Sequence, residues 1–392
     1  DPIDHMLWIA PEEQLPSLTD DSIIEGQEKG VIYLFTIIKS LLALGYDRKQ
    51  LGWTVITQKA QPLHKYDEVN PTHASIHGLM GTLAKEYSHW KIRVIDLESL
   101  ASWPMQELFT LPSDADGNPY VYREQQWHQQ ELVPVRYNQQ EETLYKTGGV
   151  YVVIGGAGGI GEVWSEYVIR MYEAKVIWIG RREKDANIQA KIDRLASIGP
   201  TPSYIAADAT DQEELYRAYE EIKQQYGPIH GIVHSAIVLL DKSLANMEEE
   251  RFRAGLRVKV DVSVNIAEVF QGEPLDFVLF FSSMNSFVKA AGQSNYVAGC
   301  TFKDAFASQL ALEWPCAVKV MNWGYWGTVG TVASEEYQRR MKSRGVGSIE
   351  PAEAMKALEA LLVGPMNQLA FAKMTTSSTW INVNKEHSFV LM

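Results

Sequence analysis

The chain has 392 residues, of which 46% are hydrophobic and 22% are charged, and its formal net charge is −13. This length and composition are typical of a folded protein with two domains of ordinary size. The negative charge argues against sequence-independent binding of nucleic acids and against attachment to anionic membranes, since both depend on clustered lysine and arginine.

Cys300 and Cys316 are the two cysteines of the chain, too few for a disulfide framework or a zinc cluster. The sequence contains no uninterrupted apolar run of about 18 residues and no visible signal peptide. We therefore expect a cytoplasmic protein in a reducing compartment. Because the chain opens with DPIDHM and not with an initiator methionine, we also expect a segment of a longer polypeptide.

Strands and helices alternate through the first half of the sequence, a pattern typical of a parallel sheet with crossover helices. The predicted elements are a strand over 7–10, a helix of about 25 residues ending near Gly45, a strand over 53–57, a helix over 71–89 and a strand over 91–97. Turn residues cluster in 112–120, extended structure is expected over 121–135, and the polar stretch 136–149 is expected to connect the two halves.

The second half repeats this alternation and predicts a doubly wound sheet. Its predicted strands are 150–154, 176–179, 203–206, 230–234, 276–281 and 318–323, with helices between them. The stretch 83–97 is similar to 310–323, and either common ancestry of the two halves or convergent packing at helix–strand junctions explains the similarity.

Glycines crowd the turn that follows the first strand of the second half, in VVIGGAGGIGEVW (152–164). Gly156, Gly158 and Gly161 fit the pattern G-x-G-x-x-G, in which the first two allow a tight turn and close approach to a pyrophosphate. The third lets the following helix pack against the strand, and the start of that helix offers free N–H groups. Taken alone, this pattern also fits a glycine-rich turn without a ligand.

Charged residues follow the next two strands. Arg181 and Arg182 come after the strand at 176–179, where the ribose of a dinucleotide would lie. An arginine there accommodates a 2′-phosphate, which favours NADPH, although solvated charges at a strand end are the alternative. Asp208 ends the third strand and suits an adenine amine, with a helix N-cap at Asp208 or Asp211 as the alternative.

Reduction of a ketone by hydride leaves an alkoxide, which needs an acidic donor, a second hydrogen bond and a nearby cation. Lys259, Ser283 and Tyr296 are the candidates. Ser283 follows a strongly apolar strand, at the edge where open α/β sheets bind ligands, and Tyr296 opens a predicted helix. Taken singly, each of the three also fits a structural role.

The segment 148–374 resembles a short-chain dehydrogenase/reductase, and most closely the ketoreductase domain of a modular polyketide synthase. The matching stretches are GGAGGIG, GRR, AADATD, HSAIVLLDKSL, LRVKVD, FFSSMNS, GQSNYVAGC and NWGYWG. Lys259, Ser283 and Tyr296 follow one another in this family's order, 24 and 13 residues apart. IHGLMGTLAKEYSHWKIRVIDL is similar to the N-terminal structural subdomain of these ketoreductases, so the resemblance covers nearly the whole chain.

The resemblance implies two Rossmann-like subdomains, a truncated structural one without cofactor at 1–147 and a catalytic NADPH-binding one at 148–392. It implies that Tyr296 donates a proton, that Ser283 polarises the carbonyl and that Lys259 lowers the pKa of the tyrosine. The implied cofactor-binding residues are Gly156, Gly158, Gly159, Ile160, Gly161, Arg181, Arg182, Asp208 and Ala209. The implied substrate is a 3-ketoacyl chain on an acyl carrier protein, with neighbouring synthase domains in a longer polypeptide and no metal.

Three residues depart from the family pattern. Cys300 stands where the family has an asparagine, Ile237 replaces the glycine of the HxAG pattern, and Ile154 replaces a threonine. A thiol is a poor hydrogen-bond donor and acceptor, so we expect weaker or unusual activity.

Other positions of the sequence bear on the configuration of the hydroxyl group in the product. Leu239, Leu240 and Asp241 align with the Leu-Asp-Asp motif of family members that give a D-hydroxy product. Val288 occupies the position of the tryptophan that marks the opposite class. We therefore expect a D-hydroxy product, with Asp241 contributing to stereocontrol.

Two other interpretations stay open. A degenerate ketoreductase kept as a scaffold is favoured by Cys300 and Ile237. A free-standing reductase of small ketones is disfavoured by the large half without a cofactor motif.

The segment 327–348 has glycines near both ends and a charged helix between them, and we expect it to form a lid. Its basic stretch RRMKSR fits either contact with an acidic carrier protein or a solvated helix face.

Overall fold

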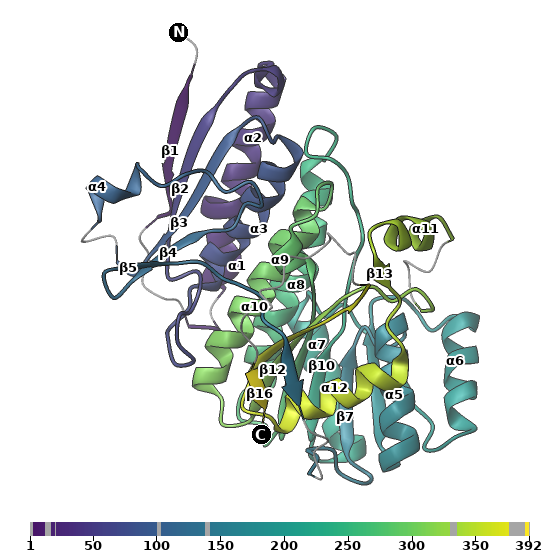
Figure 1. Ribbon diagram of the computed structural model, residues 1–392. Coiled ribbons are helices and arrows are strands. Elements are labelled where there is room, and N and C mark those ends of the chain that lie inside the picture. Colours follow the sequence, from purple (N-terminus) through teal and green to yellow (C-terminus); the bar gives the residue numbers. More distant parts are fainter. Residues whose placement is uncertain are drawn as a thin grey trace. The chain divides into compact units, whose positions relative to one another are not determined.

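The computed structural model describes residues 3–11, 17–19, 21–99, 103–137, 142–329, 335–375 and 389–391. The chain forms two compact units, each built on its own sheet (Figure 1). The first unit comprises Asp1–Gln130, Val238–Val260 and Asn285–Leu312, and the second comprises Glu131–Ile237, Asp261–Met284 and Glu313–Met392. The predicted α/β class with two Rossmann-like sheets is confirmed. The chain passes between these units more than once, so they are not continuous stretches of sequence. The predicted boundary between a structural part at 1–147 and a catalytic part at 148–392 stays a prediction.

The first unit contains a five-stranded sheet in the order β1-β2-β3-β4-β5, in which β1 to β4 are parallel and β5 is antiparallel to β4. Its strands are β1 (His5–Ile9), β2 (Gly52–Gln58), β3 (Lys91–Leu97), β4 (Tyr120–Arg123) and β5 (Gln126–His128). The three strands predicted here are confirmed. The extended structure expected over 121–135 contains the β4–β5 hairpin, whose turn residues Glu124 and Gln125 both have positive φ.

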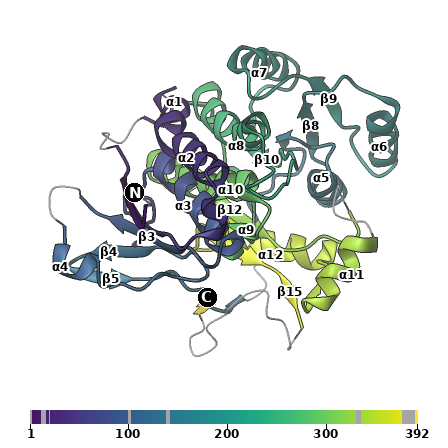
Figure 2. The same cartoon turned by 90° about the horizontal axis from the view of Figure 1, so that it is seen from above.

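Of the helices within the first 130 residues, those before residue 87 cover one face of the sheet (Figures 1 and 2), whereas Leu108 in the helix at 105–108 packs against Ile56, Ile95 and Leu97 on the other face. The helical elements are α1 (Ser22–Gln27), a π-helical turn (Glu28–Ile32), α2 (Tyr33–Ala43), a 3₁₀ turn (Tyr46–Arg48), α3 (Pro71–Glu86) and α4 (Met105–Leu108). The helix expected to end near Gly45 is present but changes to π geometry in its middle. All side chains from 71 to 84 of α3 are buried. A side chain at Gly78 would lie 2.6 Å from the carbonyl oxygen of Val297, so α3 also packs tightly against the helix that carries Tyr296.

The second unit contains a parallel seven-stranded sheet in the order β14-β12-β11-β10-β7-β8-β9. Its strands are β7 (Val150–Ile154), β8 (Lys175–Gly180), β9 (Ser203–Ala206), β10 (Gly231–His234), β11 (Phe277–Ser283), β12 (Ala317–Trp323) and β14 (Gln368–Phe371). All six strands predicted in this half are confirmed. The seventh, β14, was not predicted, because QLAF is short and lies half exposed at the edge of the sheet.

Helices connect these strands. They are α5 (Gly159–Tyr172), α6 (Ala186–Ala196), α7 (Gln212–Tyr226), α8 (Glu249–Val269), α9 (Asn285–Val288), α10 (Ser294–Glu313), α11 (Glu335–Ser343) and α12 (Pro351–Val363). Apolar side chains of α5, α6 and α12 share one core with the sheet. Of the described helices, none combines the length and the apolar composition that a membrane span requires.

Two small pairs of strands complete the structure. The strand β13 (Val346–Gly347) pairs with β15 (Lys373–Met374), and β6 (Val135–Tyr137) pairs with β16 (Phe389–Leu391). The charged helix expected inside the segment 327–348 is α11, while residues 330–334 of that segment lie outside the described residues. Its action as a lid stays a prediction.

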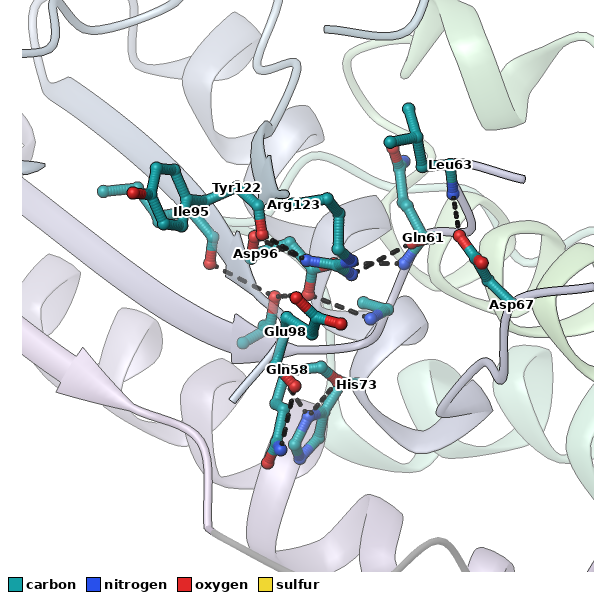
Figure 3. A network of polar contacts seen from close by, with 12 residues as sticks. Gln58, Gln61, Leu63, Asp67, His73, Ile95, Asp96, Glu98, Tyr122 and Arg123 are labelled. Carbon is teal, nitrogen blue, oxygen red and sulfur yellow. Dashed lines mark hydrogen bonds and ion pairs between the residues drawn. The ribbon is translucent and has the colours of Figure 1, made fainter. Parts of the chain in front are cut away.

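A buried ion pair lies at the carboxyl ends of β3 and β4, drawn in Figure 3. The carboxylate of Asp96 accepts a hydrogen bond from Nη2 of Arg123 at 2.6 Å, and from the backbone N–H groups of Ala60 and Gln61 at 2.9 and 3.2 Å. Arg123 also donates to the carbonyl oxygen of Gln61 at 3.1 Å. Both charged side chains are almost fully buried. The edge at which open α/β sheets bind ligands is therefore filled, in this sheet, by the chain's own polar groups.

His77 is linked to this ion pair through the hydroxyl group of Thr57. Its Nε2 is 2.7 Å from Oγ1 of Thr57, which donates its own hydrogen to Asp96 at 2.7 Å. Nε2 of His77 must therefore be the donor to Thr57, so this nitrogen carries a hydrogen whether the imidazole is neutral or cationic. Burial lowers the pKa of His77 to about 4, although the negative charge of Asp96 acts in the opposite direction. His77 is consequently neutral in the folded chain at pH 7.

We expect this histidine to make the fold less stable in mild acid. Below its ordinary pKa of about 6.5 the unfolded chain binds a proton that the folded chain binds only near pH 4, so the free energy of unfolding falls as the pH drops through this window. The loss between pH 7 and pH 4 is about 3 kcal/mol. His77→Gln, which keeps an N–H donor, is expected to remove this part of the pH dependence in urea unfolding. The same pH dependence in both proteins would contradict the assignment.

Candidate active site

The predicted cofactor-binding residues lie at the carboxyl edge of the seven-stranded sheet. The strand order reverses between β7 and β10, and open α/β sheets bind ligands at such a switch point. The glycine loop follows β7, Arg181 and Arg182 follow β8, and Asp208 and Ala209 follow β9. Ser283 is the last residue of β11, at the same edge.

The glycine loop passes close to neighbouring backbone and side chains. Gly155 has φ +83°, and a Cβ there would lie 2.7 Å from Cα of Ala236, just after β10. A Cβ at Gly156 would lie 2.1 Å from Cδ1 of Trp178, and one at Gly161 would lie 2.9 Å from the carbonyl oxygen of Gly155. Side chains at these positions would push the loop away from the sheet, so the glycines are required by the local packing.

The start of α5 suits an anion. The helix begins at Gly159, and among the described residues no side chain caps it at Gly158. The N–H groups of Gly159, Ile160 and Gly161 have no acceptor inside the helix, because the first turn of any α-helix leaves its donors unsatisfied. The pyrophosphate of a nicotinamide dinucleotide fits this start, since it offers N–H donors and the positive end of the helix dipole.

Lys191 on α6 adds a positive charge that the sequence did not reveal. Its Nζ donates to the carbonyl oxygen of Ala157 in the glycine loop at 2.8 Å and lies 2.7 Å from the carboxylate of Glu162. Arg194 lies 3.0 Å from the same carboxylate. The acidic residue in the first turn of α5 is thus neutralised by two cations, which keeps the loop favourable for a phosphate. A lysine in an amphipathic helix gives no sequence signal for such a contact.

Arg181 and Arg182 are exposed at the end of β8. Arg182 pairs with Asp185 at 3.5 Å, and Asp185 also caps α6 by accepting from the N–H of Ile188. No acidic residue is present at the tip of β8, since the strand ends at Gly180 and the two arginines follow. This pattern matches the chemistry of a 2′-phosphate site.

The two aspartates after β9 have different roles. Asp211 caps α7 by accepting from the N–H of Glu214 at 3.0 Å. Asp208 accepts from both the N–H and the hydroxyl of Thr210, at 3.0 and 2.8 Å, and so shapes the turn. The carbonyl oxygen of Ala209 accepts from Nδ2 of Asn265 on α8 at 2.9 Å. The N-cap alternative is therefore correct for Asp211 and wrong for Asp208.

Lys259 of α8 and Tyr296 of α10 come together in the first unit. The ammonium nitrogen lies 4.8 Å from the centroid of the tyrosine ring, and the two residues are 2% and 9% exposed. A Cβ at Gly299 would lie 2.7 Å from Cδ of Lys259, so the absence of a side chain there lets the lysine cross α10. Sequence reasoning missed Gly299, although a glycine inside a predicted helix is a signal of close packing.

Two more titratable groups are fully buried on α10. Burial raises the pKa of the Cys300 thiol, while the charge of Lys259 and a hydrogen bond with Tyr296 act in the opposite direction. Burial and the charge of Lys259 lower the pKa of Lys303 well below its usual range. Cys300 is thus a protonated thiol at neutral pH, next to the tyrosine and at the position where the related family has an asparagine.

The remaining predicted residues divide between the units. Ser283 belongs to the second unit, and its carbonyl oxygen accepts from Nδ2 of Asn322 at 3.0 Å. Asp241 belongs to the first unit, where its carboxylate accepts from Nε2 of Gln293, three residues before Tyr296. The oxygen of Gln293 accepts from Nδ2 of Asn285 at 2.7 Å. Sequence reasoning missed Gln293, which carries no charge and no motif of its own.

Comparisons with known sequences show which proteins this chain is similar to. The KR domain family model matches residues 149–328. The chain is 54% identical over 375 residues to polyketide synthase PksN and 54% identical over 389 residues to polyketide synthase PksM, both of Bacillus subtilis (strain 168). These alignments cover 96% and 99% of this chain but 7% and 9% of the two relatives, so the chain spans less than a tenth of their length.

Comparisons with solved structures support the fold. A ketoreductase domain from the bacillaene assembly line superimposes with a TM-score of 0.75 at 21% identity, covering 95% of this chain and 93% of that chain. A multidomain structure with adenylation and ketoreductase parts, from a nonribosomal peptide synthetase module that selects keto acids, gives a TM-score of 0.83 at 20% identity. That likeness covers 96% of this chain and 32% of that chain.

Proposed function

We propose that this chain, which belongs to the ketoreductase domain family of polyketide synthases, reduces a ketone to a hydroxyl group with NADPH as the hydride donor. Its proposed substrate is a 3-ketoacyl chain held as a thioester on an acyl carrier protein, supplied by neighbouring domains of a longer synthase. The observation that carries the proposal is the buried Lys259 ammonium placed 4.8 Å from the ring of Tyr296. A lysine beside a buried tyrosine suits proton donation to a developing alkoxide.

Three side chains have proposed roles in the chemistry. A bound reduced nicotinamide supplies the hydride. Tyr296 donates its phenolic proton to the carbonyl oxygen, and the positive charge of Lys259 stabilises the tyrosinate that remains. Ser283, at the carboxyl end of β11, is the proposed second hydrogen-bond donor to that oxygen. Its assignment rests on the order of Lys259, Ser283 and Tyr296 along the chain.

The proposed cofactor contacts follow from the edge of the seven-stranded sheet. The N–H groups at the start of α5 hold the pyrophosphate, and Arg181 and Arg182 hold the 2′-phosphate. Asp208 is proposed to contact the adenine. Asp241, bonded to Gln293 near the start of α10, is proposed to favour the D-hydroxy product, which chiral chromatography of the product tests.

The preference for NADPH is expected to depend on the two arginines. In the double variant Arg181→Ala/Arg182→Ala, KM for NADPH in the reduction of a 3-ketoacyl thioester is expected to rise by about tenfold or more, because each charge-assisted hydrogen bond contributes about 1.5–3 kcal/mol. KM for NADH is expected to stay the same. Arg217→Ala, an exposed arginine bonded to the carbonyl oxygen of Glu213, is the matched control. A wild-type chain that used both cofactors equally well would contradict the assignment.

A further inference from the structure

Glu86, the last residue of α3, bonds two loops of the first unit at once. One carboxylate oxygen accepts from the N–H of Leu244 at 2.7 Å, and the other accepts from the N–H of Gly292 at 2.8 Å. Leu244 lies in the loop 238–248, which precedes α8, and Gly292 lies in the loop 289–293, which precedes α10. A single side chain therefore joins two segments that are far apart in the sequence.

Both loops lead directly to the proposed catalytic residues. The loop 238–248 continues into α8, which carries Lys259, and the loop 289–293 continues into α10, which carries Tyr296 in its first turn. Gly292 has φ +83°, so the chain makes there a turn that other residues rarely adopt, and its N–H is the group that Glu86 holds. The position of this turn sets where α10 begins.

The same two loops meet at a second point, where Gln293 donates to Asp241. Other side chains hold only one loop each. Nζ of Lys39 donates to the carbonyl oxygens of Leu244 and Ala245 at 2.9 and 2.6 Å. Nζ of Lys289 donates to Asn118 at 2.8 Å. Lys39 and Asn118 thus each contact one of the two loops, whereas Glu86 contacts both.

The chemistry of this position requires a carboxylate. An ionised carboxylate presents two acceptors and no donor, so it satisfies two N–H groups at once. A glutamine of the same shape has one acceptor and one NH₂ group, and the NH₂ group would face an N–H. Glutamine can therefore keep one of the two bonds and must lose the other.

We propose that Glu86 is a positioning residue for ketone reduction, which fixes the starts of α8 and α10 relative to each other and thereby holds Lys259 against Tyr296. This inference rests on the proposed function. Glu86 touches neither substrate nor cofactor, so the first 130 residues would contribute to catalysis indirectly, by positioning Lys259 and Tyr296.

Glu86→Gln tests this role, with Glu68→Gln as the matched control, because Glu68 is an exposed partner of Lys59. We expect Glu86→Gln to lower kcat by about tenfold or more, while the Kd of NADPH changes by less than about twofold. In hydrogen exchange, the amide of Leu244 or Gly292 is expected to exchange about tenfold faster than in the wild type. The control is expected to match the wild type in all three measurements.

A second variant keeps the test informative if Glu86→Gln does not fold. Lys39→Met removes the two bonds to the carbonyl oxygens of the loop 238–248 and leaves the loop 289–293 untouched, so faster exchange is expected in the first loop alone. Unchanged exchange in both loops and a kcat of Glu86→Gln within about twofold of the wild type would overturn the inference. A wild-type chain without reductase activity would overturn the proposed function, and exchange would then show separately whether Glu86 holds the loops.

Discussion

Tyr296→Phe is expected to lower kcat for ketone reduction by about 10²–10⁴-fold, because it removes the proposed proton donor and leaves the ring in place. The ring is 9% exposed and lies against Lys259, so phenylalanine keeps most of the packing. Binding of NADPH is expected to be unchanged, since the proposed cofactor contacts belong to the seven-stranded sheet. Turnover with a 3-ketoacyl thioester and titration with NADPH measure the two effects separately.

The matched control is Tyr216→Phe, because Tyr216 is an exposed tyrosine on α7. It loses the same hydroxyl group and is expected to keep wild-type kcat. A Tyr296→Phe variant with turnover within about tenfold of the wild type would show that another group protonates the alkoxide.

Breaking the Asp96–Arg123 ion pair is expected to lower the free energy of unfolding by about 3–5 kcal/mol. Arg123→Met leaves the carboxylate of Asp96 buried without its cation, and the N–H groups of Ala60 and Gln61 compensate only part of that charge. Asp96→Asn leaves the guanidinium of Arg123 buried without its anion. Urea unfolding followed by tryptophan fluorescence measures the loss.

The double variant Asp96→Asn/Arg123→Met separates the ion pair from simple loss of packing. If the charges are coupled, its destabilisation is smaller than the sum of the two single changes. Lys59→Met, at the exposed Lys59–Glu68 pair, is the control and is expected to change the free energy of unfolding by less than about 1 kcal/mol. Additive single effects would contradict the coupling.

Most of the strands could be predicted from the sequence because their signal is local. The predicted strands 91–97 and 150–154, both rich in β-branched residues, match the observed strands residue for residue. The strand β14 escaped prediction since a short, half-exposed edge strand leaves little apolar pattern. The π-helical turn at Glu28–Ile32 escaped as well, because its side chains continue the helical pattern on both sides.

The division into compact units could not be predicted, because sequence order does not tell which sheet a crossover segment contacts. The segments 238–260 and 285–312 follow the cofactor loop in the chain but pack with the first 130 residues. The chemistry of ketone reduction made Lys259 and Tyr296 candidates from the sequence, and the family resemblance added that the lysine acts on the tyrosine. The contacts of Glu86 had no signal at all, since a glutamate at the end of a helix is ordinary in sequence and distinctive only through the two N–H groups it holds.

The most direct test of the proposed reaction follows a deuterium atom from the cofactor into the product. NADPH deuterated at C4 of the nicotinamide, in the R and S forms separately, is supplied with a 3-ketoacyl thioester on an acyl carrier protein, and the product is analysed by mass spectrometry. The proposal predicts a hydroxyacyl product that carries deuterium on the carbinol carbon from one of the two forms, and very little of it with Tyr296→Phe. Binding of NADPH without transfer of deuterium from either form would contradict it and would favour a degenerate ketoreductase that serves as a scaffold.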